Sequence, residues 1–174
     1  MLIKKMGVGS RERGYSLVEA LVVMAIIGVI SVVTVPNFVA QYRSFRFKAS
    51  LRQFTTDIRF ARQEAVSKNQ WSRLSFVPGS AAYRILESND AGSTWTTTAF
   101  QKTLGQQGFF HSSSTFTDVD SDADSSLDIT FKNDGTLDGA AGTAVMRTSD
   151  DIPYNQFTVA ISLVGKLTTT KAKY

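Results

Sequence analysis

The residues Arg13-Gly14-Tyr15-Ser16-Leu17-Val18-Glu19, followed by an unbroken apolar run over residues 20–35, decide how this chain is organised. Residues 15–35 carry a single charge, Glu19, and a helix of about 20 mainly apolar residues can cross a bilayer. A charge inside hydrocarbon costs about 2.5–3.5 kcal/mol even on lenient insertion scales and is usually functional. A secretory signal peptide has its small-residue cleavage site after the apolar core. Here Gly14 precedes the core, so cleavage at Gly14 would leave the apolar helix on the mature protein.

The order of residues from Gly14 to Glu19 resembles the type IV prepilin signal: glycine, an aromatic residue, a small polar residue, two aliphatic residues and a glutamate. The resemblance implies that a prepilin peptidase cleaves between Gly14 and Tyr15 and methylates the new amino group of Tyr15. It also implies that Glu19 pairs with the N-terminal ammonium of a neighbouring subunit in a filament, which would remove the cost of an isolated charge in lipid. Tyr15 departs from the commoner phenylalanine but keeps the ring. The alternative is an uncleaved signal anchor with Glu19 near the membrane interface.

The chain of 174 residues divides into four predicted segments. These are a cleaved leader (1–14), a transmembrane and assembly helix (15–36), an amphipathic continuation of that helix (37–70) and an antiparallel β domain (71–174). Most of the formal charge of +4 lies in the leader, and basic residues beside a first helix keep that end cytoplasmic. The charges therefore predict a single-pass protein whose β domain lies outside the cytoplasmic membrane, and the prepilin resemblance implies the bacterial inner membrane with a periplasmic or extracellular β domain. The absence of cysteine excludes disulfides and thiol chemistry.

The helix has two predicted soft points, Gly28 and Pro36, because glycine weakens a helix interior and proline removes a backbone hydrogen bond. Pilin helices often carry a glycine and a proline at these places, so the resemblance assigns both to assembly. Beyond Pro36, apolar residues at helical spacing, with one gap of six, predict a stripe that packs on the sheet of the domain. This stripe comprises Phe38, Tyr42, Phe45, Leu51, Phe54, Ile58, Ala61 and Ala65. Asn69 and Gln70 mark the predicted end of the helix.

From Trp71 the sequence alternates with period two and is rich in β-branched and aromatic residues, which predicts strands. The expected strands are residues 71–77, 83–87, 95–102, 127–132, 144–148 and 156–164, with 166–170 as a last strand. Turn residues separate them, and Asn133-Asp134-Gly135 between Phe131 and Leu137 predicts a hairpin. Strands joined by short turns predict antiparallel sheets packed on the helix, an α+β fold of the pilin type. Residues 105–126 are expected to form a long loop or a ragged sheet edge.

The end of the helix and the strands also resemble the GspH/FimT-type minor pilins and pseudopilins. The similarity rests on Ala61-Arg62-Gln63-Glu64-Ala65 with Lys68-Asn69, on Ile129-Thr130-Phe131 with Gly135, and on the turn at Gly165-Lys166. It implies a long N-terminal helix with two β-sheets and a role at the filament tip or in the initiation of assembly. The implied partners are other pilins or pseudopilins, the prepilin peptidase and an inner-membrane assembly platform, in a type IV pilus or a type II secretion pseudopilus.

DNA binding is the first alternative function. Family members that bind DNA carry Gly-Arg-x-Arg near the C-terminus, whereas this chain has Gly165-Lys166-Leu167-Thr168. Lysine lacks the planar fork with which arginine holds a phosphate. Lys166, Lys171 and Lys173 could still attract a phosphate backbone without reading sequence, as a minor pilin for DNA uptake would.

A calcium-dependent, adhesin-like surface module is the second alternative. Calcium takes six to eight oxygen ligands, and alternating aspartates could converge on an ion. The candidate ligands are Asp118, Asp120, Asp122, Asp124 and Asp128. The EF-hand template fails in this stretch because its glycine and final glutamate are missing.

We expect no enzyme and no cofactor. His111 is the single histidine and lies in a serine-rich stretch, as surface residues often do. No nucleophile-elbow motif and no phosphate-binding glycine loop occur in the sequence.

Overall fold

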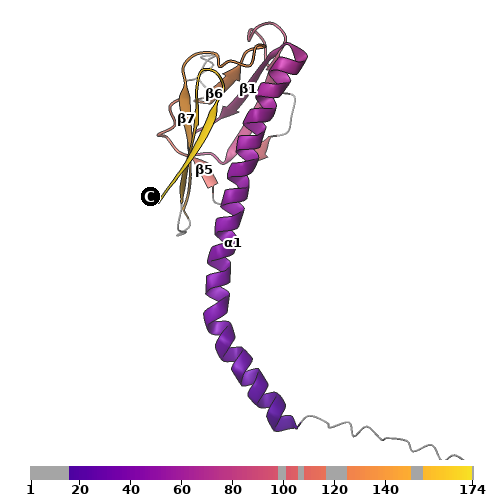
Figure 1. The fold of residues 1–174 in the computed structure, drawn as a ribbon, viewed down its shortest axis with the longest axis vertical. Coiled ribbons are helices and arrows are strands. Elements are labelled where there is room, and N and C mark those ends of the chain that lie inside the picture. Colours follow the sequence, from indigo (N-terminus) through magenta and orange to yellow (C-terminus); the bar gives the residue numbers. More distant parts are fainter. Residues whose placement is uncertain (1–15, 98–100, 106–107, 117–124, 150–154, 174) are drawn as a thin grey trace, which may run out of the picture. The chain divides into compact units, whose positions relative to one another are not determined.

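The computed structural model describes residues 16–97, 101–105, 108–116, 125–149 and 155–173 (Figure 1). The chain divides into two compact units, Met1–Val39 and Ala40–Tyr174, and the helix α1 (Leu17–Lys68) contributes to both. In the part of the chain that is described, no helix combines the length and the apolar character that crossing a bilayer requires. The membrane-spanning segment predicted over residues 15–36 stays a prediction.

The C-terminus of α1 is capped by its own backbone. Asn69 follows the last helical residue with a φ of 52°, a left-handed conformation that asparagine tolerates better than most residues. The Gln70 N–H donates to the Ala65 carbonyl at 3.0 Å and the Asn69 N–H donates to the Val66 carbonyl at 3.4 Å. This pair of bonds is a Schellman motif, which satisfies carbonyls that a helix end leaves free. The helix end predicted at Asn69 and Gln70 is confirmed.

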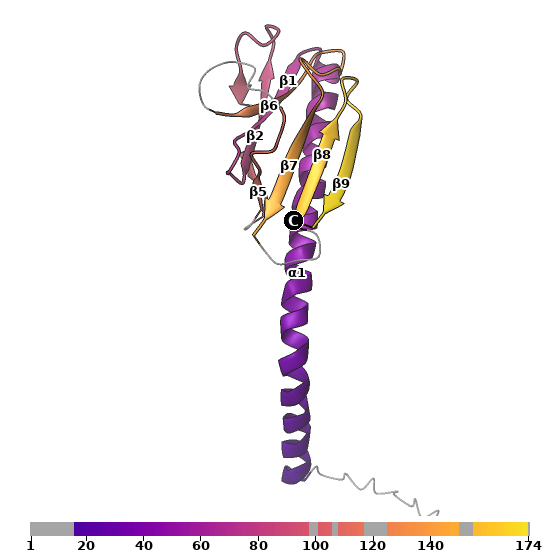
Figure 2. The same cartoon turned by 90° about the vertical axis from the view of Figure 1, so that its left-hand side faces the viewer.

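Two antiparallel sheets follow the helix, and the predicted α+β fold is confirmed. The first sheet has the order β3-β2-β1-β6, with β4 also paired to β2, and the second has the order β5-β7-β8-β9, whose strands lie side by side in Figure 2. The strands are β1 (Trp71–Phe76), β2 (Ala82–Ser88), β3 (Thr96–Thr97), β4 (Lys102–Thr103), β5 (Gly108–Phe110), β6 (Leu127–Phe131), β7 (Gly142–Thr148), β8 (Gln156–Ile161) and β9 (Leu167–Ala172).

The strand predictions hold for most of the domain and fail at two places, residues 95–102 and the end of the strand expected over residues 156–164. The single strand expected over residues 95–102 is replaced by β3 and β4, which pair with different parts of β2. The segment 105–126, expected to be a long loop or a ragged sheet edge, contains the short edge strand β5, whose Phe110 is fully buried. The strand expected over residues 156–164 ends at Ile161, because residues 163–164 form the turn to β9. The predicted hairpin at Asn133-Asp134-Gly135 is confirmed by the antiparallel bridge between Phe131 and Leu137.

One face of α1 supplies the helical half of the core. Its buried hydrophobic residues are Phe47, Leu51, Phe54, Ile58, Ala61 and Ala65, spaced by alternating steps of four and three. Phe54 is surrounded by the rings of Phe76, Tyr83 and Phe110, with centroid distances of 5.1–6.3 Å. Edge-to-face and tilted contacts of this kind are favourable for aromatic rings.

The first part of the predicted apolar stripe was wrong. Phe45 is 67% exposed and Phe47 is 6% exposed, and Phe38 and Tyr42 are exposed as well. At about 100° per residue, Phe38, Tyr42 and Phe45 lie roughly 140–180° around the helix from Phe47. The sequence pattern had joined two different faces of α1, and only the face that begins at Phe47 packs on the sheets.

Candidate functional site

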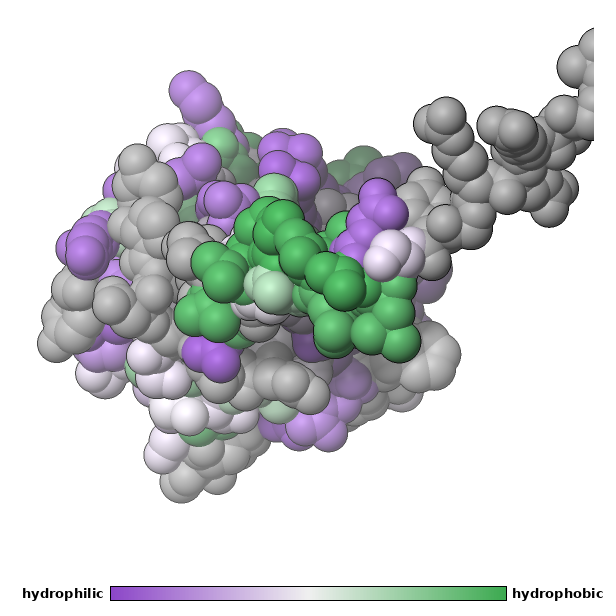
Figure 3. All heavy atoms as spheres, turned by 90° about the horizontal axis from the view of Figure 1, so that it is seen from below, coloured by the Kyte–Doolittle hydropathy of each residue, from purple (hydrophilic) through white to green (hydrophobic). Residues whose placement is uncertain are grey.

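The first turns of α1 present an apolar surface with one charge. Glu19 lies in the first helical turn, where a carboxylate interacts favourably with the helix dipole, and its side chain is exposed. Figure 3 shows the hydrophobic side chains of this part of the helix as a continuous surface. They include Leu17, Val18, Leu21, Val22, Val23, Met24, Ile26, Ile27, Val29, Ile30 and Val32. Gly14 and Tyr15, the predicted cleavage and methylation residues, lie outside the described residues.

Polar groups within this apolar stretch are satisfied by the helix itself. The Ser31 hydroxyl donates to the Ile27 carbonyl at 2.7 Å and the Thr34 hydroxyl donates to the Ile30 carbonyl at 2.9 Å. A Cβ added at Gly28 would meet nothing within 4 Å, so the space beside Gly28 is open within this chain. The helix continues through Pro36, although proline has no N–H to donate to the preceding turn. The surface is therefore suited to close contact with other apolar groups.

Arg62 joins the helix to both sheets. Its Nε–H donates to the Gly135 carbonyl at 2.9 Å, and its Nη1 lies 3.5 Å from the Gly165 carbonyl. Both glycines have positive φ, 79° and 75°. A Cβ at residue 165 would lie 2.7 Å from Arg62 Nε, and a Cβ at residue 135 would lie 2.9 Å from Val66 Cγ2. The backbone of each turn can approach α1 this closely because both residues are glycines.

A groove lies beside Arg62, between the last turns of α1 and the turn that leads into β9. Its walls include Arg59, Arg62 and Val66 of the helix and Gly165, Lys166 and Leu167 of the hairpin, and its volume is about 580 Å³. Among the described residues, no carboxylate forms an ion pair with any of its three cationic side chains. We call this the basic groove.

The three lysines proposed for DNA binding are all exposed but do not form one cluster. Lys166 lies in the basic groove, whereas Lys171 pairs with Phe157 near the other end of β9 and Lys173 follows that strand. Five residues of extended chain separate Lys166 from Lys171 by roughly 17 Å. The structure therefore brings Lys166 together with Arg59 and Arg62, which the sequence reasoning did not connect to it.

Asp128 is the one candidate calcium ligand that lies among the described residues. It lies in β6, its side chain is buried, and its Oδ2 is 3.3 Å from Nη1 of the buried Arg73. A buried carboxylate that is already paired with an arginine is poorly placed to bind a metal ion as well. Asp118, Asp120, Asp122 and Asp124 lie outside the described residues. Within the described part of the chain, no group of three His, Asp or Glu side chains could hold a metal ion.

A buried polar network ties β4 and β2 to the helix. Asp57 is buried and accepts bonds from the Tyr83 hydroxyl and from Lys102 Nζ, the latter at 2.6 Å. Burial, followed by the bond to Asp57, raises the pKa of Tyr83 well above its usual range. The three side chains satisfy one another's hydrogen-bonding groups and link α1 to β2 and β4.

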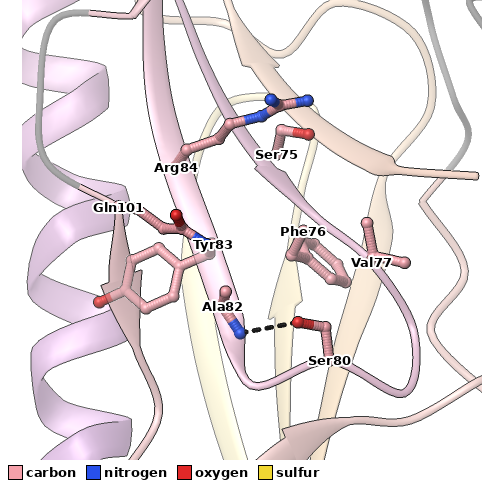
Figure 4. A pocket seen from close by; sticks show the side chains of 8 residues that line it. All are labelled: Ser75, Phe76, Val77, Ser80, Ala82, Tyr83, Arg84 and Gln101. Atoms are coloured by element: carbon pink, nitrogen blue, oxygen red, sulfur yellow. Dashed lines mark hydrogen bonds between the residues drawn. The ribbon is translucent and has the colours of Figure 1, made fainter. Parts of the chain in front are cut away.

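A small pocket of about 240 Å³ lies beside the loop from β1 to β2 (Figure 4). Tyr83 and Arg84 extend from β2 in different directions there, and Ser80 accepts a hydrogen bond from the Ala82 N–H at 3.0 Å. Arg84 is the one charged residue of its lining and has interactions elsewhere. His111 follows directly after β5, and its Nε2 lies 2.7 Å from Arg147 Nη1. Burial, together with the charge of Arg147, lowers the pKa of His111. His111 Nδ1 also lies 2.8 Å from the exposed Ser113 hydroxyl oxygen and accepts a hydrogen bond from the Ser113 N–H at 3.1 Å.

Comparison with protein families decides the class of the chain. The family model described as type II transport protein GspH matches residues 50–165, about two thirds of the sequence. This chain belongs to the GspH family. A second family model, the prokaryotic N-terminal methylation motif, matches residues 9–35 of this GspH-family protein. No individual curated protein sequence matches it.

Solved structures show the same fold as this GspH-family chain. The minor pseudopilin EpsH from the type 2 secretion system of Vibrio cholerae is similar with a TM-score of 0.54 and 14% identity, over 71% of this chain and 95% of EpsH. The type IV minor pilin FimU from Pseudomonas aeruginosa is similar with a TM-score of 0.55 and 13% identity, over 75% of this chain and 96% of FimU. At such identities the likeness concerns the fold alone.

Membership of the GspH family makes this chain a type IV pilin-like minor pilin or pseudopilin. The methylation motif implies processing by prepilin peptidase, membrane anchoring and assembly with other pilins into a pilus or pseudopilus. The GspH match spans Arg62, Gly135 and Gly165, the three residues that join the helix to both turns, and it ends before Lys166, Lys171 and Lys173.

Proposed function

We propose that this protein is a minor subunit which is cleaved after Gly14, anchored in the bacterial inner membrane by its N-terminal helix, and assembled through that helix into a type IV pilus or a type II secretion pseudopilus. The cytoplasmic leader and the periplasmic domain follow from the charge of residues 1–14. The proposed place is the tip of the filament or the complex that initiates it. The observation that carries the proposal is the apolar N-terminal surface of α1 with Glu19 as its one charge.

An exposed apolar surface of this length requires a partner that excludes water. Lipid can cover it before assembly, and the helices of neighbouring subunits can cover it afterwards. Both environments are compatible with Ser31 and Thr34, because each hydroxyl donates to a carbonyl of the same helix and needs no water. Phe38, Tyr42 and Phe45 extend the exposed apolar character of α1 on a face that the domain does not use.

Glu19 supplies the specific element of this assembly. Glu19 is exposed, and no ion pair between described residues involves it. The ammonium of a processed chain beginning at Tyr15 is a partner of opposite charge. Pairing inside a helix bundle would offset the cost of burying either charge alone, which is about 2.5–3.5 kcal/mol for a carboxylate at the centre of a membrane helix.

The proposal is tested by comparing Glu19→Ala with wild type for membrane insertion and for filament assembly. Loss of the charge should leave insertion intact, since the helix becomes more apolar, and should reduce the amount of the protein recovered in sheared filaments. Val18→Ala changes a neighbouring exposed side chain without changing charge and serves as the matched control. Wild-type filament levels for Glu19→Ala would remove the assigned role of the carboxylate.

DNA uptake and a calcium-dependent surface role are weaker candidates. Lys166 is separated from Lys171 and Lys173 by the length of β9, so the lysines do not follow one continuous track for a phosphate backbone. The pairing of Asp128 with Arg73 removes one ligand from the calcium set.

A further inference from the structure

The basic groove presents cationic groups that the fold leaves available. Arg59 and Lys166 are exposed, and no described residue pairs with either charge. Arg62 is half-buried and lines the groove, and two of its five N–H donors are directed to backbone carbonyls. A cationic side chain in this position can bind a carboxylate in addition to its structural contacts.

The groove also has an apolar part. Val66, which forms part of the wall, is 51% exposed, and Leu167 lies across from it on the hairpin. The adjoining turn exposes Leu163 and Val164 by 54% and 65%. Aliphatic side chains gathered beside unpaired cations are characteristic of a surface that excludes water from part of a bound partner.

We propose that the basic groove binds a segment of another protein that carries carboxylates beside an aliphatic side chain. The carboxylates would pair with Arg59, Arg62 and Lys166, and the aliphatic side chain would pack on Val66 and Leu167. The proposal rests on the proposed function in one respect: the segment belongs to a neighbouring subunit of the same filament. It adds a contact made by the β domain to those made by the N-terminal helix.

The shape and composition of the groove favour a protein segment over nucleic acid. A shallow, open site of about 580 Å³ with an aliphatic wall can accommodate a side chain and the backbone beside it. A nucleic acid backbone is held by cations repeated along its length, and Lys171 and Lys173 lie too far along β9 to continue the row that begins at Lys166.

The test uses the full chain in neutral detergent micelles and fluorescence anisotropy of a labelled peptide of two leucines flanked by glutamates. Three further probes are compared with it: the peptide with glutamines in place of the glutamates, the peptide with serines in place of the leucines, and a short DNA duplex. Arg59→Glu and Lys166→Glu reverse groove charges, and Val66→Ser removes the aliphatic wall. Arg52→Glu and Lys171→Glu are matched controls, since they reverse exposed charges on α1 and β9 outside the groove.

We expect the acidic peptide to bind and both altered peptides to bind more weakly. Reversal of Arg59 or Lys166 should raise Kd about fivefold or more, and Val66→Ser should raise it as well, while the two controls leave it within about twofold. The absence of peptide binding, or equal effects of groove and control variants, would overturn the proposal. Tighter binding of the DNA duplex with the same sensitivity to Arg59 and Lys166 would overturn it in favour of a nucleic acid surface. None of these results depends on filament formation, so they leave the Glu19 test of the assembly helix separate.

Discussion

The contact of Arg62 with two glycine turns predicts that Gly165→Ala is more destabilising than an ordinary glycine substitution. Gly165 has a φ of 75°, and an L-residue in that region costs about 1–2 kcal/mol. The added Cβ would also lie 2.7 Å from Arg62 Nε and 2.9 Å from Arg62 Cζ, so the guanidinium must move away from its bonds to Gly135 and Gly165. Loss of these half-exposed charged hydrogen bonds adds about 1–2 kcal/mol. The total is a loss of about 2–4 kcal/mol in the free energy of unfolding.

Gly139 provides a matched control for this prediction. Its φ is 84°, close to that of Gly165, and a Cβ at Gly139 would meet nothing within 4 Å. Gly139→Ala should therefore show the backbone cost alone, about 1–2 kcal/mol. Arg62→Ala removes the group that collides with the new methyl, so in that background the cost of Gly165→Ala should fall to that of Gly139→Ala.

The assay is urea unfolding of the full chain in neutral detergent, followed by tryptophan fluorescence. Both tryptophans, Trp71 and Trp95, lie in the β domain and report on its unfolding. Equal losses for Gly165→Ala and Gly139→Ala in the wild-type background would refute the account of the Arg62 contact. A cost of Gly165→Ala that is unchanged by Arg62→Ala would refute it too.

Two other predictions concern the core face of α1 and the loop after β2. Phe47→Ala should lower the free energy of unfolding of the β domain by about 3–5 kcal/mol in the same assay. Phe45→Ala, two residues earlier, should change that free energy by about 0.5 kcal/mol or less. Similar effects of the two substitutions would contradict the assignment of the buried face. Asp90 accepts bonds from Ser88 and Thr94, which lower the pKa of its carboxyl to about 2. Because the pKa of Asp90 is lower in the folded than in the unfolded state, the ionised carboxylate stabilises the fold above about pH 4, and this stabilisation is lost as the pH falls towards 2. Asp90→Asn should therefore flatten the dependence of the free energy of unfolding on pH between about pH 4 and pH 2. An unchanged slope would contradict the assignment.

The fold could be predicted from the sequence where local chemistry decides the structure. Asn69 can adopt a left-handed conformation and ends the helix, and Asn133-Asp134-Gly135 turns the chain between Phe131 and Leu137. The alternation of apolar residues located the major strands to within a few residues at each end. These features depend on the residues of one segment at a time, which is why a single sequence contains enough information to place them.

Errors arose where one segment fits two patterns. Phe45 and Phe47 both lie at helical spacing from some apolar neighbour, and the step of six from Phe45 to Leu51 was the indication that the predicted stripe changed face. A residue four positions before Leu51, Phe47, continues the buried series without a gap. β5 has three residues, too few for a period of two to be recognised, although its Phe110 is central to the aromatic core.

The contacts of the candidate site could not be predicted from the sequence, because they join distant segments. Arg62 is 73 residues from Gly135 and 103 residues from Gly165, and the spacing of these residues says nothing about their proximity. The resemblance to GspH/FimT-type proteins drew attention to each of the three residues separately. The basic groove was missed for the same reason, since Arg59 and Lys166 belong to a helix and a turn that meet only in the folded domain.

The central claim is that the chain is a prepilin whose apolar helix stays on the mature protein. Intact mass and N-terminal sequencing of the protein recovered from membranes, for wild type and for Gly14→Ala, test this claim most directly. The account predicts a wild-type chain that begins with N-methylated Tyr15 and a Gly14→Ala chain that keeps its leader. A wild-type chain that still begins at Met1 in a host with an active prepilin peptidase would contradict the account.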